Sequence, residues 1–354
     1  MSDLAPLVIE PKETQAIWGG DALVRVYGKQ ADPSEKIGES WECWDENVVR
    51  NEPYAGSSLA QLRVKLGAQL MGTLDSNRIF PVLTKIIDAR QSLSVQVHPN
   101  DAYAQRVEGQ PNGKTECWVI LDAQPGAELV LGWTKATTRD EYQRRVKDGT
   151  LGDILRRVPV KRNDAFYLPS GTLHAIGAGI QLFETQQASD LTYRIFDWNR
   201  IGADGKPRQL HVEKAADVLN YAEGKTAQTA HLPYRVAGMS LEAYIADPRF
   251  VVERMEVEGE AVLQPEDVPL VIMTMEDGVS LAGGGANVQL DRWTTALLPA
   301  AAGRVVVTPK AAGARTLMVT PSRKSWLRRA QGAGVSAAAL ERFVAQFEEV
   351  PANA

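Results

Sequence analysis

The stretch SVQVHPND, residues 94–101, carries two side chains that can bind a metal, Gln96 and His98, separated by one valine. Successive side chains of a β-strand point to opposite faces. Gln96 and His98 therefore share one face of the strand, while Val95 and Val97 share the other. We expect the valines to pack into a core and the opposite face to carry chemistry.

Two further segments place polar side chains in apolar surroundings. Glu116 stands early in the strand-like run GKTECWVIL, and His174 follows the turn PSG in PSGTLHAIG. Imidazole and carboxylate groups suit borderline divalent metals, and a catalytic metal site keeps one position open. Together with His98 these residues would form such a site, and Gln96 would add a neutral oxygen ligand. Taken singly, each is more often a hydrogen-bonded or edge residue, but their combination favours a metal.

A fourth polar segment is ETQQASDLTYRIFDWNR, residues 184–200, where Asp190 and Arg194 stand four residues apart. An arginine can clamp a phosphate or a carboxylate, or stabilise a developing oxyanion. Asp190 is a candidate acid or base, or a partner that holds Arg194. The alternative is a surface ion pair, which contributes little to stability.

The elements that must position these residues are mostly short strands. β-branched and aromatic runs broken by Pro, Gly, Asn and Asp turns are typical of a β-sandwich or barrel. Strands are expected at residues 80–89, 92–98, 115–123, 127–133, 164–169, 172–177, 179–187 and 191–198. Helical spacing of apolar residues predicts two insertions and two later helices, at residues 57–72, 137–158, 212–222 and 335–350.

The chain of 354 residues is long enough for two domains. We predict a catalytic, metal-binding domain at residues 1–235, which includes both helical insertions. A β-rich domain without a metal is expected at residues 236–320, because no histidine follows His231. Residues 321–354 are predicted to form a C-terminal helical tail.

Composition and charge argue against several classes of protein. The formal net charge is −5, so no overall basic field favours nucleic acid or an anionic membrane. No apolar run approaches the roughly 20 residues that cross a bilayer, and the N-terminal residues lack the pattern of a secretory signal. Cys43 and Cys117 form no CxxC motif, which suits structural thiols in a reducing cytoplasm.

The blocks LSVQVHPND, GKTECWVIL, PSGTLHAIGAGI and QQASDLTYRIFDWNR, preceded by WGG at 18–20 and GESWE at 38–42, follow one another along the chain. In this order they resemble the type I phosphomannose isomerases in their shorter bacterial form, over roughly residues 10–320. The resemblance implies a mainly β cupin fold: a jelly-roll β-sandwich with a helical insertion and a second cupin-like β-domain. It also implies the reversible, zinc-dependent interconversion of mannose 6-phosphate and fructose 6-phosphate, with one zinc ion per chain.

The resemblance further implies roles for individual residues. The metal ligands would be Gln96, His98, Glu116 and His174; the catalytic groups Lys114, Asp190 and Arg194; and a substrate-binding lysine Lys85. In this division of labour Lys114 and Asp190 are candidates for proton transfer, and Arg194 stabilises an enediolate or holds the sugar phosphate. Long-form members carry a histidine immediately before the lysine of the K-x-E block, where this chain has Gly113. The ring-opening group is therefore not carried over.

Two other classes of function fit parts of the pattern. Two histidines and one carboxylate also describe a non-haem iron oxygenase of cupin fold, and a sugar-binding cupin could keep the fold without catalysis. The charges of Lys114, Asp190 and Arg194 argue against an oxygenase, whose site needs a more apolar lining. The expected partner is a small-molecule sugar phosphate, with neither nucleic acid nor membrane, and the protein is expected to be a cytoplasmic monomer or homodimer.

Overall fold

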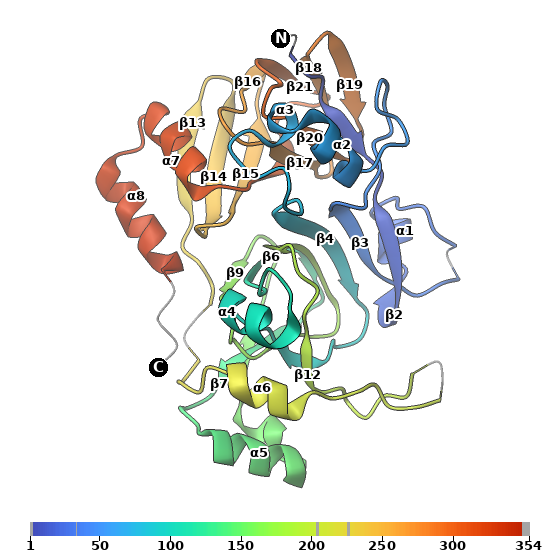
Figure 1. The fold of residues 1–354 in the computed structure, drawn as a ribbon, viewed down its shortest axis with the longest axis vertical. Coiled ribbons are helices and arrows are strands. Elements are labelled where there is room, and N and C mark those ends of the chain that lie inside the picture. Colours follow the sequence, from blue (N-terminus) through green and yellow to red (C-terminus); the bar gives the residue numbers. More distant parts are fainter. Residues whose placement is uncertain (1–2, 33, 203–204, 225–226, 349–354) are drawn as a thin grey trace. The chain divides into compact units, whose positions relative to one another are not determined.

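The computed structural model describes residues 3–32, 34–202, 205–224 and 227–348. Its sheets are antiparallel and account for most of the regular structure, which confirms the mainly β fold class (Figure 1). By its internal contacts the chain divides into two compact units. Unit 1 holds the residues up to 12, 41–84 and 230–348, and unit 2 holds residues 13–40 and 85–229.

Unit 2 is built on two antiparallel sheets. The six-stranded sheet has the order β2-β3-β4-β11-β6-β9, with bounds Lys12–Gly20, Ile37–Cys43, Val82–Ala89, Ile180–Gln187, Glu116–Ala123 and Ala165–Leu168. The five-stranded sheet has the order β12-β5-β10-β7-β8, with bounds Tyr193–Phe196, Val95–Val97, His174–Ile176, Glu128–Trp133 and Leu155–Pro159. Every strand expected between residues 80 and 198 is present, and several are shorter than expected because the chain leaves the ladder at Pro and Gly turns.

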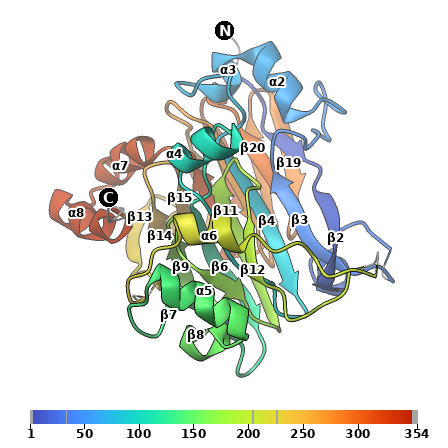
Figure 2. The ribbon, with the colours of Figure 1, turned by 60° about the horizontal axis from the view of Figure 1, so that its bottom comes forward.

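Short helices cover one face of the five-stranded sheet (Figure 2). The helical elements of unit 2 are α1 (Ala22–Arg25), α4 (Asp101–Tyr103), the π-helical turn η1 (Ala104–Glu108), α5 (Arg139–Asp148), the 3-10 turn η2 (Leu151–Ile154) and α6 (Val212–Val218). α5 begins after Thr138, whose side chain accepts a hydrogen bond from Glu141 N, and ends at Gly149 with φ 70°. Tyr142 of α5 and Ala215 of α6 belong to the same buried cluster as the strand β5 valines.

Unit 1 contains the other two sheets. The seven-stranded sheet has the order β1-β20-β17-β22-β15-β14-β13, with bounds Leu7–Ile9, Thr295–Leu298, Leu270–Thr274, Ala314–Thr320, Val251–Val257, Met239–Ala246 and Leu232–Val236. The four-stranded sheet has the order β16-β21-β18-β19, with bounds Ala261–Leu263, Val305–Pro309, Val279–Gly283 and Ala286–Leu290. Helices α2 (Leu59–Leu66) and α3 (Ala68–Met71) occupy the predicted insertion at 57–72.

The compact units divide the chain differently from the predicted domain boundaries. Residues 1–235 were expected in one domain, but β1 pairs with β20, with Leu7 opposite Leu297. The first strand therefore adds an edge to the sheet of unit 1, and residues 41–84 also belong to this unit. The assignment of the catalytic role to residues 1–235 as a whole remains a prediction.

The C-terminal segment of unit 1 is helical, as the spacing of its apolar residues predicts. α7 (Arg323–Gly332), α8 (Ala337–Val344) and the turn η3 (Ala345–Phe347) lie beside β13 and β14 in Figures 1 and 2. Trp326, Phe343 and Phe347 are buried, and the first two rings have centroids 5.8 Å apart. The tail residues 349–354 lie outside the described residues.

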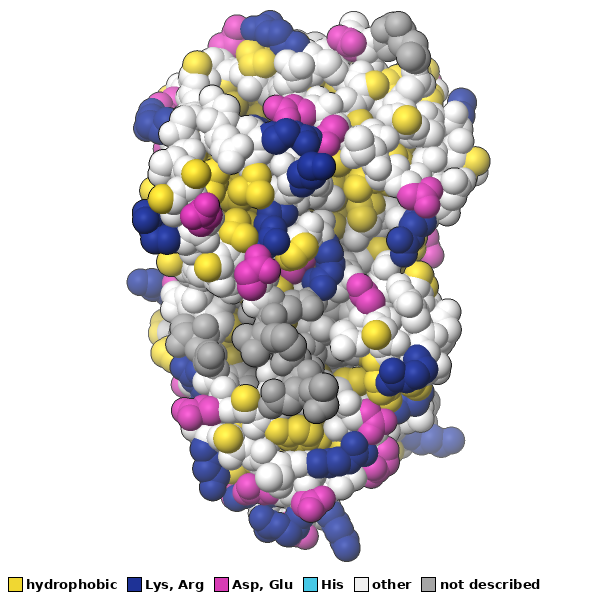
Figure 3. Space-filling view, turned by 60° about the vertical axis from the view of Figure 1, so that its left-hand side comes forward, with side chains coloured by type: hydrophobic (Ala, Val, Ile, Leu, Met, Phe, Trp, Pro, Cys, Tyr) yellow, Lys and Arg dark blue, Asp and Glu magenta, His cyan; other side chains and the backbone are white. Residues whose placement is uncertain are grey.

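Among the described residues, no helix combines the length and the apolar character needed to cross a membrane. The face drawn in Figure 3 mixes Lys and Arg with Asp and Glu side chains, and hydrophobic side chains lie among them. On this face no single sign of charge dominates, in keeping with the small net charge of the chain.

Candidate active site

Strand β5 has the two faces that its sequence predicts. Val95 and Val97 are fully buried in a hydrophobic cluster. On the opposite face Gln96 lines a pocket. The pairing register places Gln96 opposite His174 of β10 on one side and Arg194 of β12 on the other. β5 therefore lies between two neighbours that each contribute a predicted site residue.

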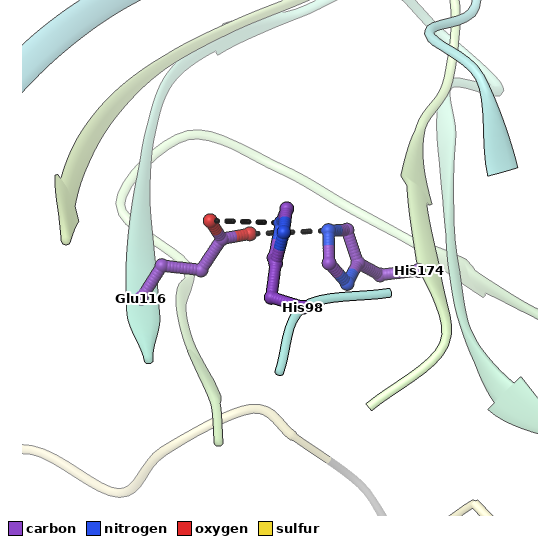
Figure 4. Close-up of side chains that lie close together, drawn as sticks. All are labelled: His98, Glu116 and His174. Atoms are coloured by element: carbon purple, nitrogen blue, oxygen red, sulfur yellow. Dashed lines mark ion pairs between the residues drawn. The ribbon is translucent and has the colours of Figure 1, made fainter. Parts of the chain in front are cut away.

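His98, Glu116 and His174 form a buried triad whose candidate ligand atoms all lie within 4.8 Å of one another. Glu116 Oε1 lies 3.2 Å from His174 Nε2, and Glu116 Oε2 lies 3.5 Å from His98 Nε2. Figure 4 shows the carboxylate facing both imidazole rings. Glu116 belongs to the six-stranded sheet, whereas His174 belongs to the five-stranded sheet and His98 follows β5 directly. The triad thus joins the two sheets of unit 2.

The second nitrogen of each histidine is held by a backbone carbonyl. His98 Nδ1 lies 2.7 Å from Leu191 O, and His174 Nδ1 lies 2.9 Å from Thr172 O. With Nδ1 donating to these oxygens, each Nε2 turns a lone pair toward Glu116. Burial lowers the pKa of both imidazoles, that of His174 to about 4. Neutral imidazole is the form that binds a metal.

The atoms at the centre of the triad lack hydrogen-bond partners. Among the described residues, His98 Nε2 and both Glu116 carboxylate oxygens are buried with no hydrogen-bond partner. Buried polar atoms in this state are costly unless something else satisfies them. A divalent cation would satisfy all three, and two imidazoles with one carboxylate are donors that zinc accepts. Gln96 Nε2 lies 3.2 Å from His174 Nε2, so its terminal amide also reaches the triad.

A pocket of about 310 Å³ within unit 2 opens beside the triad. Two lining residues contact the triad directly: Gln96 through His174, and Lys114, whose Nζ lies 3.1 Å from Glu116 Oε2. The predicted site residues that line this pocket are Lys85, Gln96, Lys114, Asp190 and Arg194. The other three form the triad, so the structure brings all the predicted residues together.

Lys85 lies between two carboxylates that sequence reasoning missed, Glu39 and Glu184, at 3.2 and 3.6 Å. Burial alone would lower the pKa of Lys85, but these carboxylates raise it above its ordinary value. Burial, and then the charge of Glu116, raise the pKa of Glu184, and Trp118 Nε1 donates to Glu184 Oε2 at 2.9 Å. The sequence signal for Glu184 was a carboxylate within the apolar part of strand β11, IQLFETQQ.

Arg194 and Asp190 do not form the surface pair that was the alternative for them. In the part of the chain that the structure describes, no ion pair joins Arg194 to a carboxylate, and its Nε has no hydrogen-bond partner. Its Nη1 donates to Gln209 O at 3.0 Å. Burial, and then the charge of Arg208, lower the pKa of Arg194. Asp190 is exposed at the margin of the pocket.

Comparison with known proteins identifies the family of this chain. Residues 7–143 match the family model described as the catalytic domain of type I phosphomannose isomerase. The chain is 41% identical over 283 residues to the mannose-6-phosphate isomerase ManA of Bacillus subtilis, an alignment that covers 78% of this chain and 88% of that protein. The chain belongs to the type I phosphomannose isomerase family. The resemblance seen in the sequence blocks is confirmed.

Other family members agree in sequence and in fold. The mannose-6-phosphate isomerase of Streptococcus mutans is 38% identical over 284 residues, covering 79% of this chain and 86% of that protein. A crystal structure of the mannose 6-phosphate isomerase from Bacillus subtilis superposes with a TM-score of 0.83 at 30% identity, over 90% of this chain and 100% of that chain. This match confirms the predicted cupin fold class.

Gly113 shows how this phosphomannose isomerase family member differs from long-form members. A Cβ added at Gly113 would lie 2.4 Å from Pro99 O and 2.4 Å from the carbonyl carbon of Asn100. Contacts this short are sterically forbidden, so a histidine at this position would need the backbone to move. The neighbouring Lys114 N donates to Pro99 O at 3.0 Å, which fixes the start of the Glu116 strand. The local packing therefore accounts for a glycine at position 113, where long-form members carry a histidine.

Proposed function

We propose that this protein catalyses the reversible interconversion of mannose 6-phosphate and fructose 6-phosphate. The observation that carries the proposal is the buried His98–Glu116–His174 triad beside a pocket lined by cations and carboxylates. Membership of the phosphomannose isomerase family supports the choice of substrate, since the relatives bear the name mannose-6-phosphate isomerase.

The reaction moves protons without a net change in oxidation state. In the direction from mannose 6-phosphate, a base removes the proton from C2 of the open-chain aldehyde while O1 gains a proton. The resulting enediol then loses the proton on O2 and gains one at C1, which gives the ketose. The site must therefore supply a base, an acid and positive charge near O1 and O2.

We assign one zinc ion per chain to the triad, with Gln96 as a fourth ligand. Bound zinc would supply a Lewis acid that polarises a substrate oxygen. The proposed ligands agree with the unpartnered atoms at the centre of the triad. The backbone carbonyls behind His98 and His174 keep the rings oriented for this task.

Lys114 and Asp190 are the proposed proton-transfer groups. Lys114 Nζ is buried beside the triad, 3.1 Å from Glu116 Oε2, and its side chain lines the pocket. It can deliver a proton or a hydrogen bond to a substrate oxygen held there. Asp190 presents a carboxylate at the exposed margin of the same pocket. Burial would lower the pKa of Lys114, but the charge of Glu116 raises it above its ordinary value, so Lys114 is the proposed proton donor and Asp190 the candidate base for the carbon-bound proton.

Arg194 is the proposed stabiliser of the negative charge that develops on the substrate oxygens. Its backbone lies opposite Gln96 across the β5–β12 pair, and its side chain lines the pocket. A cation without a carboxylate partner keeps its field available for the transition state. Lys85 is proposed to contact substrate from the six-stranded sheet, with Glu39 and Glu184 holding its ammonium in place.

The pocket lining argues against the two other classes of function. A non-haem iron oxygenase would need an apolar chamber, whereas Lys85, Lys114 and Arg194 all line this pocket. A cupin that only binds sugar has no need of a base beside a metal triad. We keep the cytoplasm as the proposed compartment, because Cys43 and Cys117 are buried thiols that form no disulfide among the described residues. A monomer or homodimer stays the proposed assembly.

An isomerase assay tests the proposed function. Fructose 6-phosphate released from mannose 6-phosphate would be measured by a coupled enzyme, before chelation, after chelation, and after zinc is restored. We expect activity to disappear with the metal and to return with zinc. Glucose 6-phosphate serves as the control substrate, and an enzyme that turns over neither sugar phosphate with zinc present would contradict the proposal.

A further inference from the structure

We propose that Arg208, held in place by Asp197, is the residue that recognises the phosphate group of the substrate, at the end of the pocket away from the triad. This inference rests on the proposed function, because it concerns the phosphate of that substrate. It adds a specificity-determining residue, Arg208, which lies outside the family blocks, and a positioning residue, Asp197, to which the resemblance gives no role.

Arg208 lines the pocket, and a carboxylate holds its guanidinium on one side. Arg208 Nε donates to Asp197 Oδ2 at 2.7 Å, and Nη2 donates to Asp197 Oδ1 at 2.6 Å. Two parallel hydrogen bonds fix the plane of a guanidinium group. The group has five N–H donors, so the donors on its other edge remain for a ligand. A planar fork of this kind suits a phosphate.

Asp197 is shared with a second arginine, which leaves the cluster positively charged. Arg200 also donates to Asp197 Oδ1, and its Nη1 donates to Ser92 O at 2.6 Å. Burial would raise the pKa of Asp197, but the hydrogen bonds from Arg208 and Arg200 lower it below its ordinary value. One carboxylate thus orients two guanidinium groups, and of these two Arg208 is the one that lines the pocket.

The distance between the Asp197 cluster and the triad can be estimated from the residues along and before strand β5. Phe196 of β12 lies opposite Val95, and after β12 the chain follows the residues that precede β5. Trp198 Nε1 donates to Leu93 O, and Arg200 reaches Ser92 O. Because strand residues advance by about 3.3 Å each, positions 94 to 92 lie roughly 7 to 13 Å from Gln96 along the strand.

An open-chain hexose phosphate matches that scale. From C1 to phosphorus it spans roughly 9 Å, given single bonds of about 1.5 Å. A substrate with C1 and C2 beside the triad therefore brings its phosphate to the level of the Asp197 cluster. The backbone of Arg194 lies opposite Gln96, at the triad end of this scale.

The remaining cations of the pocket are unsuited to a phosphate. Lys85 faces Glu39 and Glu184, and Lys114 faces Glu116, so a dianion near either would meet carboxylate charge. His211 also lines the pocket but is paired with Arg194. Its Nδ1 faces the backbone N–H of Arg194 at 3.2 Å, so Nδ1 accepts and the ring proton stands on Nε2. This neutral donor lies beside Arg194.

Arg208→Gln, Arg208→Lys and Asp197→Asn test the inference, with Arg200→Gln as the matched control. Arg200 belongs to the same ion cluster but does not line the pocket. We expect Arg208→Gln to raise KM for mannose 6-phosphate by about 10- to 100-fold, because a charged hydrogen-bond donor to the phosphate is lost. The kcat should stay within about threefold of the wild-type value, because the phosphate contact is equally strong in the ground state and the transition state. Arg208→Lys should recover part of the loss, because lysine keeps the charge without the fork.

Asp197→Asn should also raise KM, by less than Arg208→Gln does, and should leave kcat nearly unchanged. A merely structural role for Asp197 would instead lower the melting temperature without separating KM from kcat. Arg200→Gln should change KM by less than about threefold, because the Arg208 fork remains. Thermal melting of each variant confirms that it is folded.

Calorimetric titration separates this inference from the proposed function. Inorganic phosphate, which the enzyme cannot isomerise, would be titrated into the wild type and into Arg208→Gln. We expect it to bind more weakly to the variant. Equal affinity in the two proteins would overturn the role of Arg208, even if the wild type is an active isomerase. If the wild type is inactive but the variant still binds phosphate more weakly, the role of Arg208 is supported and the proposed reaction is refuted. An Arg200→Gln effect as large as that of Arg208→Gln would also overturn the inference.

Discussion

Two buried glutamates, one in each unit, lie in opposite situations. In unit 1, Glu253 Oε1 accepts hydrogen bonds from Trp326 Nε1 at 2.8 Å and from the Tyr234 hydroxyl, and Glu253 Oε2 accepts from Arg329. In unit 2, neither oxygen of Glu116 has a hydrogen-bond partner among the described residues. Both carboxylates are almost fully inaccessible to solvent.

The difference separates a structural carboxylate from a functional one. Glu253 is satisfied by side chains of β13 and α7, so its charge helps to fasten the C-terminal helix to the sheet. Glu116 has one ion pair, with Lys114 Nζ at 3.1 Å, but its two oxygens also face imidazole nitrogens that carry lone pairs. A carboxylate facing two lone pairs in a buried site is completed by a divalent cation, so this set indicates where the molecule binds something.

The largest effect on activity is expected from His174→Ala. The variant should lose both metal and isomerase activity, because one member of the metal-binding triad is gone. Removing a residue that only hydrogen-bonds to a metal ligand already lowers metal affinity by about 10- to 100-fold, so the loss of a ligand should be larger. Elemental analysis and the coupled assay on the same preparation check this. His231→Ala in unit 1 is the control, since His231 faces Glu242 at 3.3 Å and lies outside the triad. Full metal content in His174→Ala would remove His174 from the ligand set.

Arg194→Gln should have the next largest effect on activity. We expect kcat to fall by about 10²- to 10³-fold, the usual loss when a group that stabilises developing charge is removed, while metal content stays unchanged. Steady-state kinetics and elemental analysis measure the two quantities. Arg139→Gln, which removes an exposed arginine of α5 paired with Asp217, is the control. Unchanged kcat in Arg194→Gln would exclude Arg194 from the chemistry.

In unit 1 the comparison predicts a loss of stability instead of activity. Arg329→Met leaves the buried Glu253 charge without its cation, and removing one partner of a buried ion pair costs about 3–5 kcal/mol. The free energy of unfolding in urea should fall by this amount, while kcat of the folded variant and its metal content stay at the wild-type level. A stable Arg329→Met protein with impaired turnover would mean that the tail acts on the site.

A smaller effect is expected where a helix of the tail begins. The Ser336 side chain accepts a hydrogen bond from Ala339 N and caps α8. Ser336→Ala should lower the free energy of unfolding by about 1 kcal/mol, and Ser336→Asp, which can cap the same helix, should restore it. Chemical denaturation measures both, and equal stability of wild type and Ser336→Ala would show that the cap contributes nothing.

Much of the site could be predicted because its signals are local. Alternation along β5 predicted that Gln96 and His98 would face the site while Val95 and Val97 faced the core, and the register fixes this outcome once the valines are buried. Most strands of unit 2 could be predicted from turn residues and apolar runs. The helical prediction for residues 137–158 was wrong at its end, because residues 155–159 form β8 by pairing with β7. Helix caps such as Thr138 similarly mark the start of α5 in the sequence.

The rest depends on pairings between distant segments, which local patterns do not specify. Glu39 and Glu184 become site residues only because β3, β4 and β11 lie in one sheet, which brings both carboxylates to Lys85. Arg208 lies outside every strand, and its place depends on the carboxylate of Asp197. The domain boundaries differ for the same reason, since β1 joins a strand from the far end of the chain.

A zinc titration of the metal-free protein tests the central claim most directly. Chelated protein would receive zinc in steps, with bound metal and isomerase activity on mannose 6-phosphate measured on each sample. The account predicts that activity rises in proportion to bound zinc and reaches its plateau at one zinc per chain, and that Glu116→Gln shows neither binding nor activity. Full activity in protein without bound metal, or stoichiometric zinc in Glu116→Gln, would contradict it.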